Sequence, residues 1–156
     1  MPTNDRLWEN DVKALRAQKP RHILFMCVAN SARSQLAEGL ARALAPSSCR
    51  ISSAGSNPGV LHPLAMEVMK EIGVDISGHH SKDISSVDSK SVDVVITLCA
   101  EEVCPTFLGP AMRLHWGMPD PASAGSSPDE RRQAFRIVRD ELKRRLEMLF
   151  SGWTDA

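Results

Sequence analysis

The sequence predicts an α/β fold with a parallel sheet, and two apolar runs carry this prediction. HILFMCV occupies residues 22–28, and VDVVITLC, rich in β-branched residues, occupies residues 92–99. Both runs are continuous, as expected for strands that are buried on both faces of a sheet. Segments with helical spacing lie before, between and after them, and strands that are separated by helices join as parallel neighbours.

The first predicted element is a helix over residues 4–18, which ends before Pro20. Its apolar residues recur at helical spacing: Leu7, Trp8, Val12 and Leu15. A chain of 156 residues, of which 42% are hydrophobic, can bury one core and is too short for a second. We therefore expect an N-terminal helical extension at residues 1–20 and a single domain at residues 21–156.

The first strand runs into a small polar loop, ANSARS, and then into a helix that starts at about Ser34. The apolar stripe of this helix comprises Leu36, Leu40, Ala43 and Leu44. RISSAGS at residues 50–56 is predicted to form a short strand. HPLAMEVMKEIG at residues 62–73 is predicted to form a helix, with Pro63 in its first turn and Gly73 at its end.

MRLHW at residues 112–116 is a weaker strand candidate, and a long helix follows it. Ser127-Pro128-Asp129-Glu130 forms a capping-box start with proline at the first helical position. The apolar face of this helix comprises Ala134, Ile137, Val138, Leu142, Leu146 and Leu149. Its many basic residues alternate with acidic ones and lack an aromatic platform, which favours a solvated face over a nucleic-acid surface.

Composition limits the possible partners and the compartment. Lys+Arg and Asp+Glu each total 19, so no global charge attracts nucleic acid or an anionic membrane. Apolar runs fall short of the ~18 residues of a membrane helix, and the start does not resemble a signal peptide. We expect a cytoplasmic protein with no nucleic-acid or membrane partner. In that reducing compartment the four cysteines are expected to be catalytic or buried thiols rather than a disulfide framework.

Cys27 is the main catalytic candidate, because it ends a buried strand. Five residues separate it from Arg33, and a helix is expected to start directly after Arg33. Ligands bind beyond the carboxyl ends of parallel strands, where a helix N-terminus offers free N–H groups to an anion. These groups and the Arg33 guanidinium would favour the thiolate, and the planar guanidinium can donate two parallel hydrogen bonds to an oxyanion. The expected oxyanion-binding residues are Val28, Ala29, Asn30, Ser31, Ala32, Arg33 and Ser34. The alternative, a small buried cysteine at a strand end, does not require such a loop.

Two further cysteines follow the second apolar run. Cys99 ends that run, so it lies at the same sheet edge as Cys27 if the two strands are neighbours. Four residues separate Cys99 from Cys104; in a regular helix their Cα atoms would be ~8–9 Å apart, beyond the ~7 Å disulfide limit. A disulfide therefore requires unwinding, which Pro105 favours, and we expect a mobile segment from Ala100 to about Leu108. Alternatively one of these cysteines is a core residue and the other is incidental. A zinc site is disfavoured, because Arg33 would repel the cation and no nearby Cys/His pair completes a tetrahedral set.

The spacing of Cys27, Arg33 and Ser34, with the later Asp120-Pro121, resembles the low-molecular-weight protein tyrosine phosphatases. More closely, VANSARSQLAEG, VITLCAEEVCP and HWGMPDPA are similar to the thioredoxin-coupled arsenate reductases of that superfamily. The similarity covers about residues 21–150. It implies a catalytic domain with a four-stranded parallel sheet flanked by helices, in a flavodoxin-like three-layer sandwich.

The resemblance also implies a mechanism. The Cys27 thiolate attacks arsenate, and Asp120 matches the general acid that protonates the leaving oxygen. Cys99 then attacks Cys27 and releases arsenite, and Cys104 attacks Cys99. Thioredoxin, or glutaredoxin or another thiol, reduces the final disulfide, so we expect no bound cofactor and no metal. Ser34 and Asn30 orient the thiolate, and we expect a monomer.

This sequence departs from the family pattern at two places. Ala29 stands where such reductases often have glycine. His80 and Lys82 stand where some relatives use threonine and aspartate to hold a potassium ion, and the lysine ammonium could replace that ion. We therefore predict no potassium dependence.

Two rival functions remain. A tyrosine phosphatase needs Cys27, Arg33 and Asp120 but has no use for Cys99 or Cys104. In addition, Ala122 and Ser123 stand where such phosphatases commonly place aromatic residues that hold the substrate ring. The rival from another class is a non-catalytic oxyanion sensor. Cys49, in the turn into a strand, is assigned to packing.

Overall fold

A four-stranded parallel sheet forms the centre of the computed structural model, which describes residues 7–100, 107 and 109–153. The strand order is β2-β1-β3-β4. The strands are β1 (His22–Cys27), β2 (Arg50–Gly55), β3 (Val94–Thr97) and β4 (Met112–His115), and every neighbouring pair is parallel. The predicted four-stranded parallel sheet with flanking helices is therefore confirmed.

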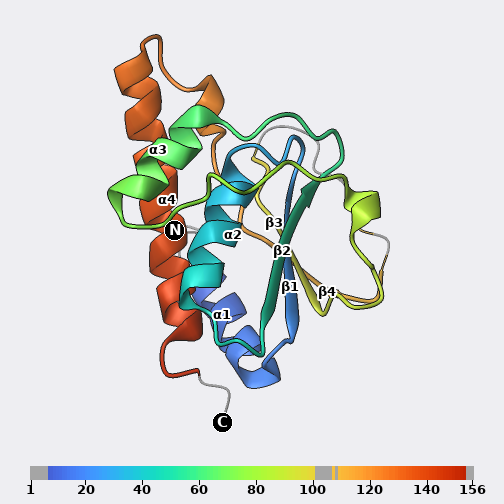
Figure 1. Cartoon of the computed structure of the whole chain (residues 1–156). Helices are drawn as coiled ribbons and strands as arrows, with labels where there is room; N and C mark the ends of the chain where they lie inside the picture. Colours follow the sequence, from blue (N-terminus) through green and yellow to red (C-terminus); the bar gives the residue numbers. More distant parts are fainter. Residues whose placement is uncertain (1–6, 101–106, 108, 154–156) are drawn as a thin grey trace.

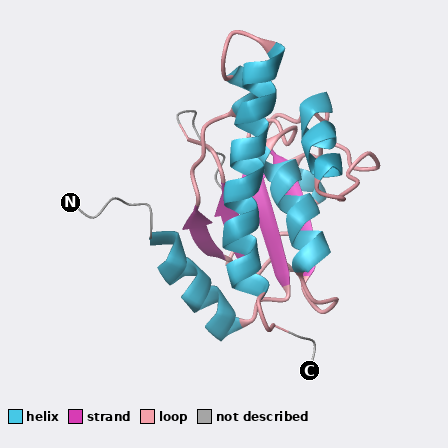
Figure 2. Cartoon of the chain, turned by 90° about the vertical axis from the view of Figure 1, so that its left-hand side faces the viewer, coloured by secondary structure: helices cyan, strands magenta, loops and turns pink. Residues whose placement is uncertain are grey.

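The long helices gather on one face of this sheet, to its left in Figure 1, and stand in front of the strands in Figure 2. They are α1 (Leu7–Gln18), α2 (Arg33–Leu44), α3 (Pro63–Glu71) and α4 (Pro128–Phe150). Among the described residues, the 3-10 helices η2 (Ile84–Ser86) and η3 (Pro121–Ser123) interrupt the loops. Ser127 begins α4 as predicted, because its hydroxyl accepts a hydrogen bond from the Glu130 amide at 3.1 Å.

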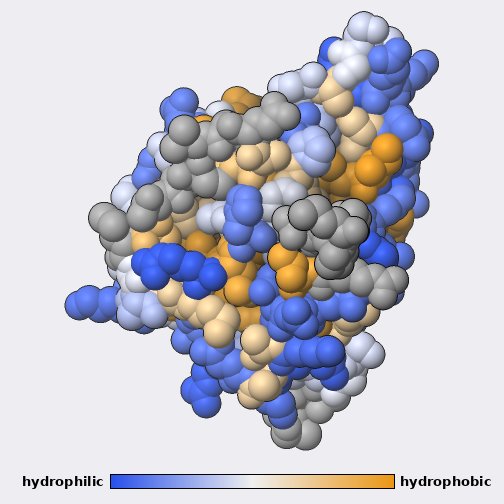
Figure 3. Space-filling model, turned by 180° about the vertical axis from the view of Figure 1, so that it is seen from behind, coloured by the Kyte–Doolittle hydropathy of each residue, from blue (hydrophilic) through white to orange (hydrophobic). Residues whose placement is uncertain are grey.

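Each face of the sheet contributes to a separate apolar core. On the helical face Phe25 and Ile96 pack with the inner sides of the helices, α4 included. On the opposite face Leu24 and Met26 pack with Phe107 and the 84–87 segment. In the view from behind in Figure 3, hydrophobic side chains gather near the middle of the surface and hydrophilic ones lie around them. β1 is thus buried on both faces, as its continuous apolar run predicts.

Some boundaries and faces differ from the sequence-based expectation. β3 ends at Thr97, so Cys99 lies two residues beyond the strand. Ile137 and Leu7 are exposed at 62% and 57%, whereas Phe135 is fully buried and faces the sheet side of α4. A pattern of apolar residues leaves the orientation of a helix uncertain by about one position, and packing decides it. None of the helices among the described residues combines the length and apolarity of a membrane span.

The N-terminal helix α1 packs on the domain along α4. Trp8, Val12 and Leu15 are buried in the main core. The guanidinium groups of Arg144 and Arg145 each lie 5.3 Å from the centre of the Trp8 ring, at cation–π distance. The extension is therefore anchored by both apolar and charged contacts.

One buried and two half-buried imidazoles oppose protonation of the folded chain. Burial lowers the pKa of His22, His62 and His79 below the ordinary value, and a nearby arginine adds to the effect on each. His22 illustrates the cause, because its ring is 3% exposed and its two nitrogens contact the hydroxyls of Ser91 and Ser52. The folded state therefore prefers these rings neutral.

Stability should consequently fall as the pH drops from about 7.5 to about 5.5. The unfolded chain binds protons at histidine near pH 6.5, whereas the folded chain resists until lower pH. The stabilisation is present above the unfolded value and is lost as pH falls through the folded values. Urea midpoints at the two pH values measure the effect, and His22→Asn should weaken it. Identical midpoints for the parent protein would contradict the prediction.

Candidate active site

Cys27 is the last residue of β1 and opens into a cavity of about 240 Å³. The cavity is lined by Cys27, Val28, Ala29, Ser31, Ala32, Arg33 and Asp120. The structure therefore brings the predicted nucleophile, the predicted anion loop, Arg33 and the candidate acid together. Asn30 and Ser34, which the sequence assigned to the same site, lie behind this lining and are buried.

The loop after Cys27 is held from outside by the segment at residues 57–62. The carbonyl oxygens of Val28, Ala29 and Ser31 accept hydrogen bonds from the amides of Asn57, Gly59 and His62, each at 2.9 Å. These carbonyl groups are thereby occupied by donors that do not line the cavity. An anion in the cavity would otherwise be repelled by them, so this scaffold favours anion binding.

Asn30 fixes the turn of the loop. It adopts a left-handed backbone with φ of 50°, a conformation in which asparagine is favoured among residues with a side chain. Its side-chain amide donates to Ser34 Oγ at 2.7 Å and to Ser53 Oγ at 2.9 Å. Its side-chain oxygen accepts from the Lys82 amide at 2.9 Å. Because the left-handed residue is Asn30 and not Ala29, the missing glycine at position 29 is tolerated.

Two hydrogen-bond donors converge on the sulfur of Cys27. The Asn30 amide nitrogen donates to it at 3.2 Å, and Ser34 Oγ lies 2.9 Å from it. Since the Asn30 side chain donates to Ser34, the Ser34 hydroxyl can direct its own proton toward the sulfur. Both contacts are those expected for stabilising a thiolate.

Arg33 is the first residue of α2, and its side chain is buried in the wall of the cavity. Its guanidinium donates to the carbonyl oxygens of Met118 at 2.9 Å and Leu98 at 3.4 Å. These carbonyl groups belong to the segments that leave β3 and precede η3. Arg33 is thereby oriented by two fixed acceptors, which preorganises the planar fork for a tetrahedral oxyanion.

Replacing Arg33 with lysine should weaken anion binding about tenfold or more. An ammonium keeps the charge but cannot keep both carbonyl contacts while also donating two parallel hydrogen bonds. Calorimetric titration with inorganic phosphate measures the change, and Arg42→Lys on the outer side of the same helix is the matched control. Equal phosphate affinity in Arg33→Lys and the parent protein would refute the role assigned to Arg33.

Asp120 has the turn role that the sequence analysis weighed against an acid role, and it also lies at the cavity. It caps η3, where its carboxylate accepts from the Ala122 amide at 3.0 Å and from the Ser123 hydroxyl at 3.1 Å. The same residue lines the cavity of Cys27. A carboxyl group there can deliver a proton to an oxygen that leaves a bound oxyanion.

His62 is a neighbour of this site that the sequence-based interpretation did not select. It caps α3 by accepting the Leu64 amide at 3.1 Å, and its ring lies 4.8 Å from that of Phe135. Burial and Arg131 lower its pKa, while the Asp120 carboxylate opposes the shift. The proline that follows His62 was the available signal, because it marks the first turn of a helix and makes His62 the cap.

Cys99 lies at the same sheet edge as Cys27. β1 and β3 are direct neighbours, and the Leu98 amide donates to the Met26 carbonyl at 3.0 Å, so the two cysteines follow paired positions. Cys99 is 1% exposed and is disulfide-bonded, whereas Cys27 is a free thiol. Cys104 and residues 101–106 and 108 of the expected mobile segment lie outside the described residues.

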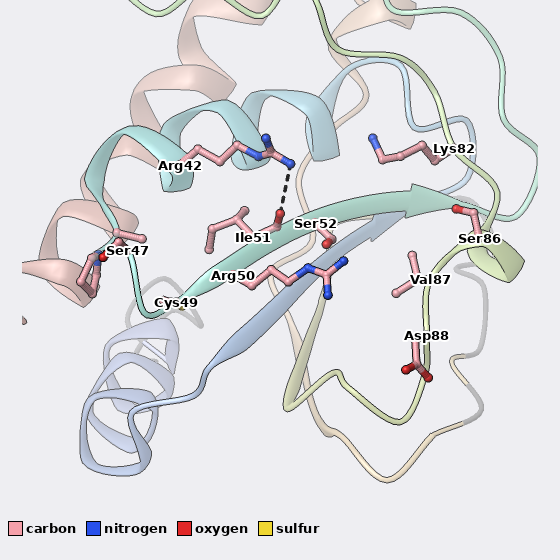
Figure 4. A pocket seen from close by; sticks show the side chains of 12 residues that line it. Arg42, Ser47, Cys49, Arg50, Ile51, Ser52, Lys82, Ser86, Val87 and Asp88 are labelled. Atoms are coloured by element: carbon pink, nitrogen blue, oxygen red, sulfur yellow. Dashed lines mark hydrogen bonds between the residues drawn. The ribbon is translucent and has the colours of Figure 1, made fainter. Parts of the chain in front are cut away.

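A second cavity of about 490 Å³ runs along the outer edge of β2 and includes Cys49 but not Cys27. Figure 4 shows Arg42 and Lys82 on one side of β2, with Arg42 donating to the Ile51 carbonyl. Burial raises the pKa of Cys49 to about 11, so this thiol stays protonated at neutral pH. The environment of Cys49 agrees with a packing role.

The Lys82 ammonium lies between a buried carboxylate oxygen and a backbone carbonyl oxygen, behind the loop that follows Cys27. Its Nζ lies 3.4 Å from Glu38 Oε1 and donates to the His80 carbonyl at 3.0 Å. Glu38 is 2% exposed and also contacts Ser53, which holds Asn30. A positive charge is thus built into the support of the loop. Among the described residues no group of three His, Cys, Asp or Glu side chains is arranged to hold a metal ion.

Potassium should therefore leave turnover unchanged relative to sodium at equal ionic strength, because the Lys82 ammonium already occupies the oxygen cluster. Lys82→Ala removes that charge and should make turnover respond to potassium. Initial rates in matched potassium and sodium chloride solutions test both statements. An increase with potassium in the parent protein would be incompatible with this role of Lys82.

Comparisons with known proteins agree with this geometry. The family model described as low molecular weight phosphotyrosine protein phosphatase matches residues 22–154. An arsenate reductase of Bacillus subtilis is 41% identical over 127 residues, which cover 80% of this chain and 91% of that protein. An arsenate reductase of Halalkalibacterium halodurans is 40% identical over the same length and coverage.

The solved structures that resemble this chain include arsenate reductases as well. An arsenate reductase in its oxidised state is 32% identical with a TM-score of 0.71, covering 85% of this chain and 98% of that one. The thioredoxin-dependent arsenate reductase of Corynebacterium glutamicum is 29% identical with a TM-score of 0.63, covering 96% of this chain and 70% of that one. The chain belongs to the low molecular weight phosphotyrosine protein phosphatase family.

Proposed function

We propose that this protein is an arsenate reductase that receives its electrons from a dithiol protein of the thioredoxin type. The observation that carries the proposal is the position of Cys99, which is disulfide-bonded at the sheet edge next to the cavity of the free thiol Cys27. A phosphatase uses the nucleophile, the arginine and the acid but has no role for a redox-active second cysteine. The names of the relatives support the same activity.

In the first step, arsenate binds to the loop at residues 28–34 and to the guanidinium of Arg33. The Cys27 thiolate then attacks arsenic. An oxygen leaves as water after Asp120 has given it a proton, so that a bond between Cys27 sulfur and arsenic(V) remains. The Cys99 thiolate then attacks the sulfur of Cys27. The sulfur–arsenic bond breaks, its electron pair reduces arsenic(V) to arsenic(III), and arsenite leaves behind a Cys27–Cys99 disulfide.

The last steps return Cys27 to its thiolate. Cys104 attacks Cys99, which frees Cys27 and moves the disulfide to the Cys99–Cys104 pair. A dithiol protein then reduces this disulfide by the same exchange. A disulfide at Cys99 together with a free Cys27 is the state that such a cascade leaves before its external reduction.

The test is arsenate-dependent NADPH oxidation in the presence of thioredoxin and thioredoxin reductase. The parent protein should turn over many times, and hydrolysis of small aryl phosphates should be a minor activity. Full multiple turnover in both Cys99→Ser and Cys104→Ser would refute the reductase. Phosphate-ester hydrolysis without arsenate turnover would instead support the phosphatase, and oxyanion binding without any turnover would support the sensor.

The compartment, the domain division and the oligomeric state complete the proposal. Cys27 must be regenerated as a thiolate in each cycle, which requires a reducing compartment, and we assign the protein to the cytoplasm. We assign the catalytic domain to residues 21–156, the helical extension to residues 1–20, and the monomer as the working unit. Gel filtration coupled to light scattering tests the last assignment.

A further inference from the structure

A cavity of about 520 Å³ lies next to Ala100, the residue that follows the disulfide-bonded Cys99, and shares no lining residue with the Cys27 cavity. Its lining combines residues of α1, the segment after β3, the end of β4 and α4: Leu7, Asp11, Ala100, His115, Gly117 and Arg145. We call it the α1 groove. Neither the loop that follows Cys27 nor Asp120 lines the α1 groove.

The floor of the α1 groove is the backbone next to Cys99. Ala100 lines it directly, and Gly117 packs so tightly that a Cβ atom there would lie 3.0 Å from the Cys99 carbonyl oxygen. The same added atom would lie 2.7 Å from Nε2 of His115. Position 117 therefore has no room for a larger side chain between His115 and the backbone of Cys99, and Cys99 itself is 1% exposed.

The wall that α1 contributes is firmly held. The Trp116 indole donates to the Asp11 carboxylate at 3.1 Å, and the Arg145 guanidinium lies 5.3 Å from the Trp8 ring and 5.6 Å from the Trp116 ring. At the start of this wall the Leu7 side chain stands 57% exposed. α1 therefore presents an exposed apolar side chain on a fixed wall of the groove that also contains Ala100.

This helix lies outside the residues that the family model matches, which begin at residue 22. The bond at Cys99 can be broken only if a thiolate of the reductant reaches one of its sulfurs. A small thiol needs no wall to do so, but a protein must place its own surface against the surroundings of the disulfide. α1 extends those surroundings in this chain.

We propose that the α1 groove is the docking surface for the dithiol protein that reduces the Cys99 disulfide, with Leu7 as its exposed apolar contact. The occupant is a small protein with an apolar surface around its reactive cysteine. This inference rests on the proposed function for the identity of the reductant. Its contact with Leu7 can nevertheless be measured without arsenate.

The test measures how fast reduced thioredoxin reduces the Cys99 disulfide of the oxidised protein, with free thiols counted over time. Leu7→Glu and Leu7→Lys should each lower the second-order rate constant about tenfold, because either charge removes the apolar contact. Ile137→Glu, which changes a side chain of similar exposure on α4 (62% against 57% for Leu7), should leave the rate constant unchanged. Reduction by dithiothreitol should be equally fast in all four proteins.

Parent-like rates with thioredoxin in both Leu7 variants would overturn the inference. Equal slowing with dithiothreitol would overturn it as well, because the substitution would then act on the disulfide and not on docking. The assay contains no arsenate, so a failure of the reductase proposal appears separately, as absent arsenate turnover in a protein whose disulfide thioredoxin still reduces.

Discussion

Cys27→Ser should lower arsenate-dependent turnover by about 10⁴-fold or more. The serine hydroxyl stays protonated at neutral pH, so the attack on arsenic is lost. Serine also cannot form the disulfide that carries two electrons away from the site, so no slower route to arsenite remains. The donors that surround the sulfur, the Asn30 amide and the Ser34 hydroxyl, do not compensate for either loss.

Binding should survive the same substitution. The outside scaffold of the loop and the anchors of Arg33 do not involve the Cys27 side chain, so Cys27→Ser should bind inorganic phosphate within a few-fold of the parent. Calorimetry measures this binding, and coupled NADPH oxidation measures turnover. Cys49→Ser is the matched control, since its thiol lies in a different cavity and should be dispensable. Turnover above a few per cent of the parent in Cys27→Ser would disprove the nucleophile.

The strands and the position of Cys27 at the start of a polar loop were predictable from sequence because their signals are local. A continuous apolar run specifies a strand buried on both faces, and a short polar loop between such a strand and a helix specifies an anion site. β1 and its loop match this expectation, and Cys27, Arg33 and Asp120 all meet in one cavity. Proline and serine before α4 specified its first turn in the same way.

The supports of the site were not predictable, because they join segments that are distant along the chain. Arg33 is oriented by the Met118 carbonyl, 85 positions away, and Asn30 by the Ser53 hydroxyl, 23 positions away. Backbone carbonyls carry no sequence signal, and polar side chains such as Ser53 occur in any loop or strand. Packing also decided which apolar residues face outward, as Leu7 and Ile137 show.

The family was easier to recognise than the details of its site, because the family is recognised from short stretches of sequence and the site is supported by contacts between distant segments. The strand and the loop that follows it can be recognised within one short stretch of sequence, whereas the supports depend on the complete fold. Lys82 is an example: its sequence position suggested a replacement for an ion, but only the structure pairs its ammonium with the buried Glu38. A charge inside the scaffold acts on the loop through Ser53 and Asn30, without touching the substrate.

Cys104→Ser should convert the enzyme into one that releases a single equivalent of arsenite per chain. Starting from the fully reduced protein, Cys27 and Cys99 still react in turn, so one arsenic atom is reduced and one disulfide forms. Without Cys104 nothing inside the chain attacks Cys99, and the Cys27–Cys99 disulfide blocks the nucleophile. Because Cys99 is 1% exposed, thioredoxin should reach this disulfide slowly, and steady turnover should fall about 100-fold or more.

The number of arsenite molecules released separates the roles of the two resolving cysteines. Cys99→Ser should release almost none, since arsenic stays bound to Cys27 when no thiolate attacks that sulfur. Cys104→Ser should release one, and Cys49→Ser should release many. Rapid quench of the reduced proteins with excess arsenate, in the presence of thioredoxin, thioredoxin reductase and NADPH, followed by counting of arsenite, distinguishes zero from one in the first burst and from many. Several equivalents from Cys104→Ser would mean that the reductant attacks Cys99 directly in the Cys27–Cys99 state, and the third cysteine would then have no necessary place in the cascade.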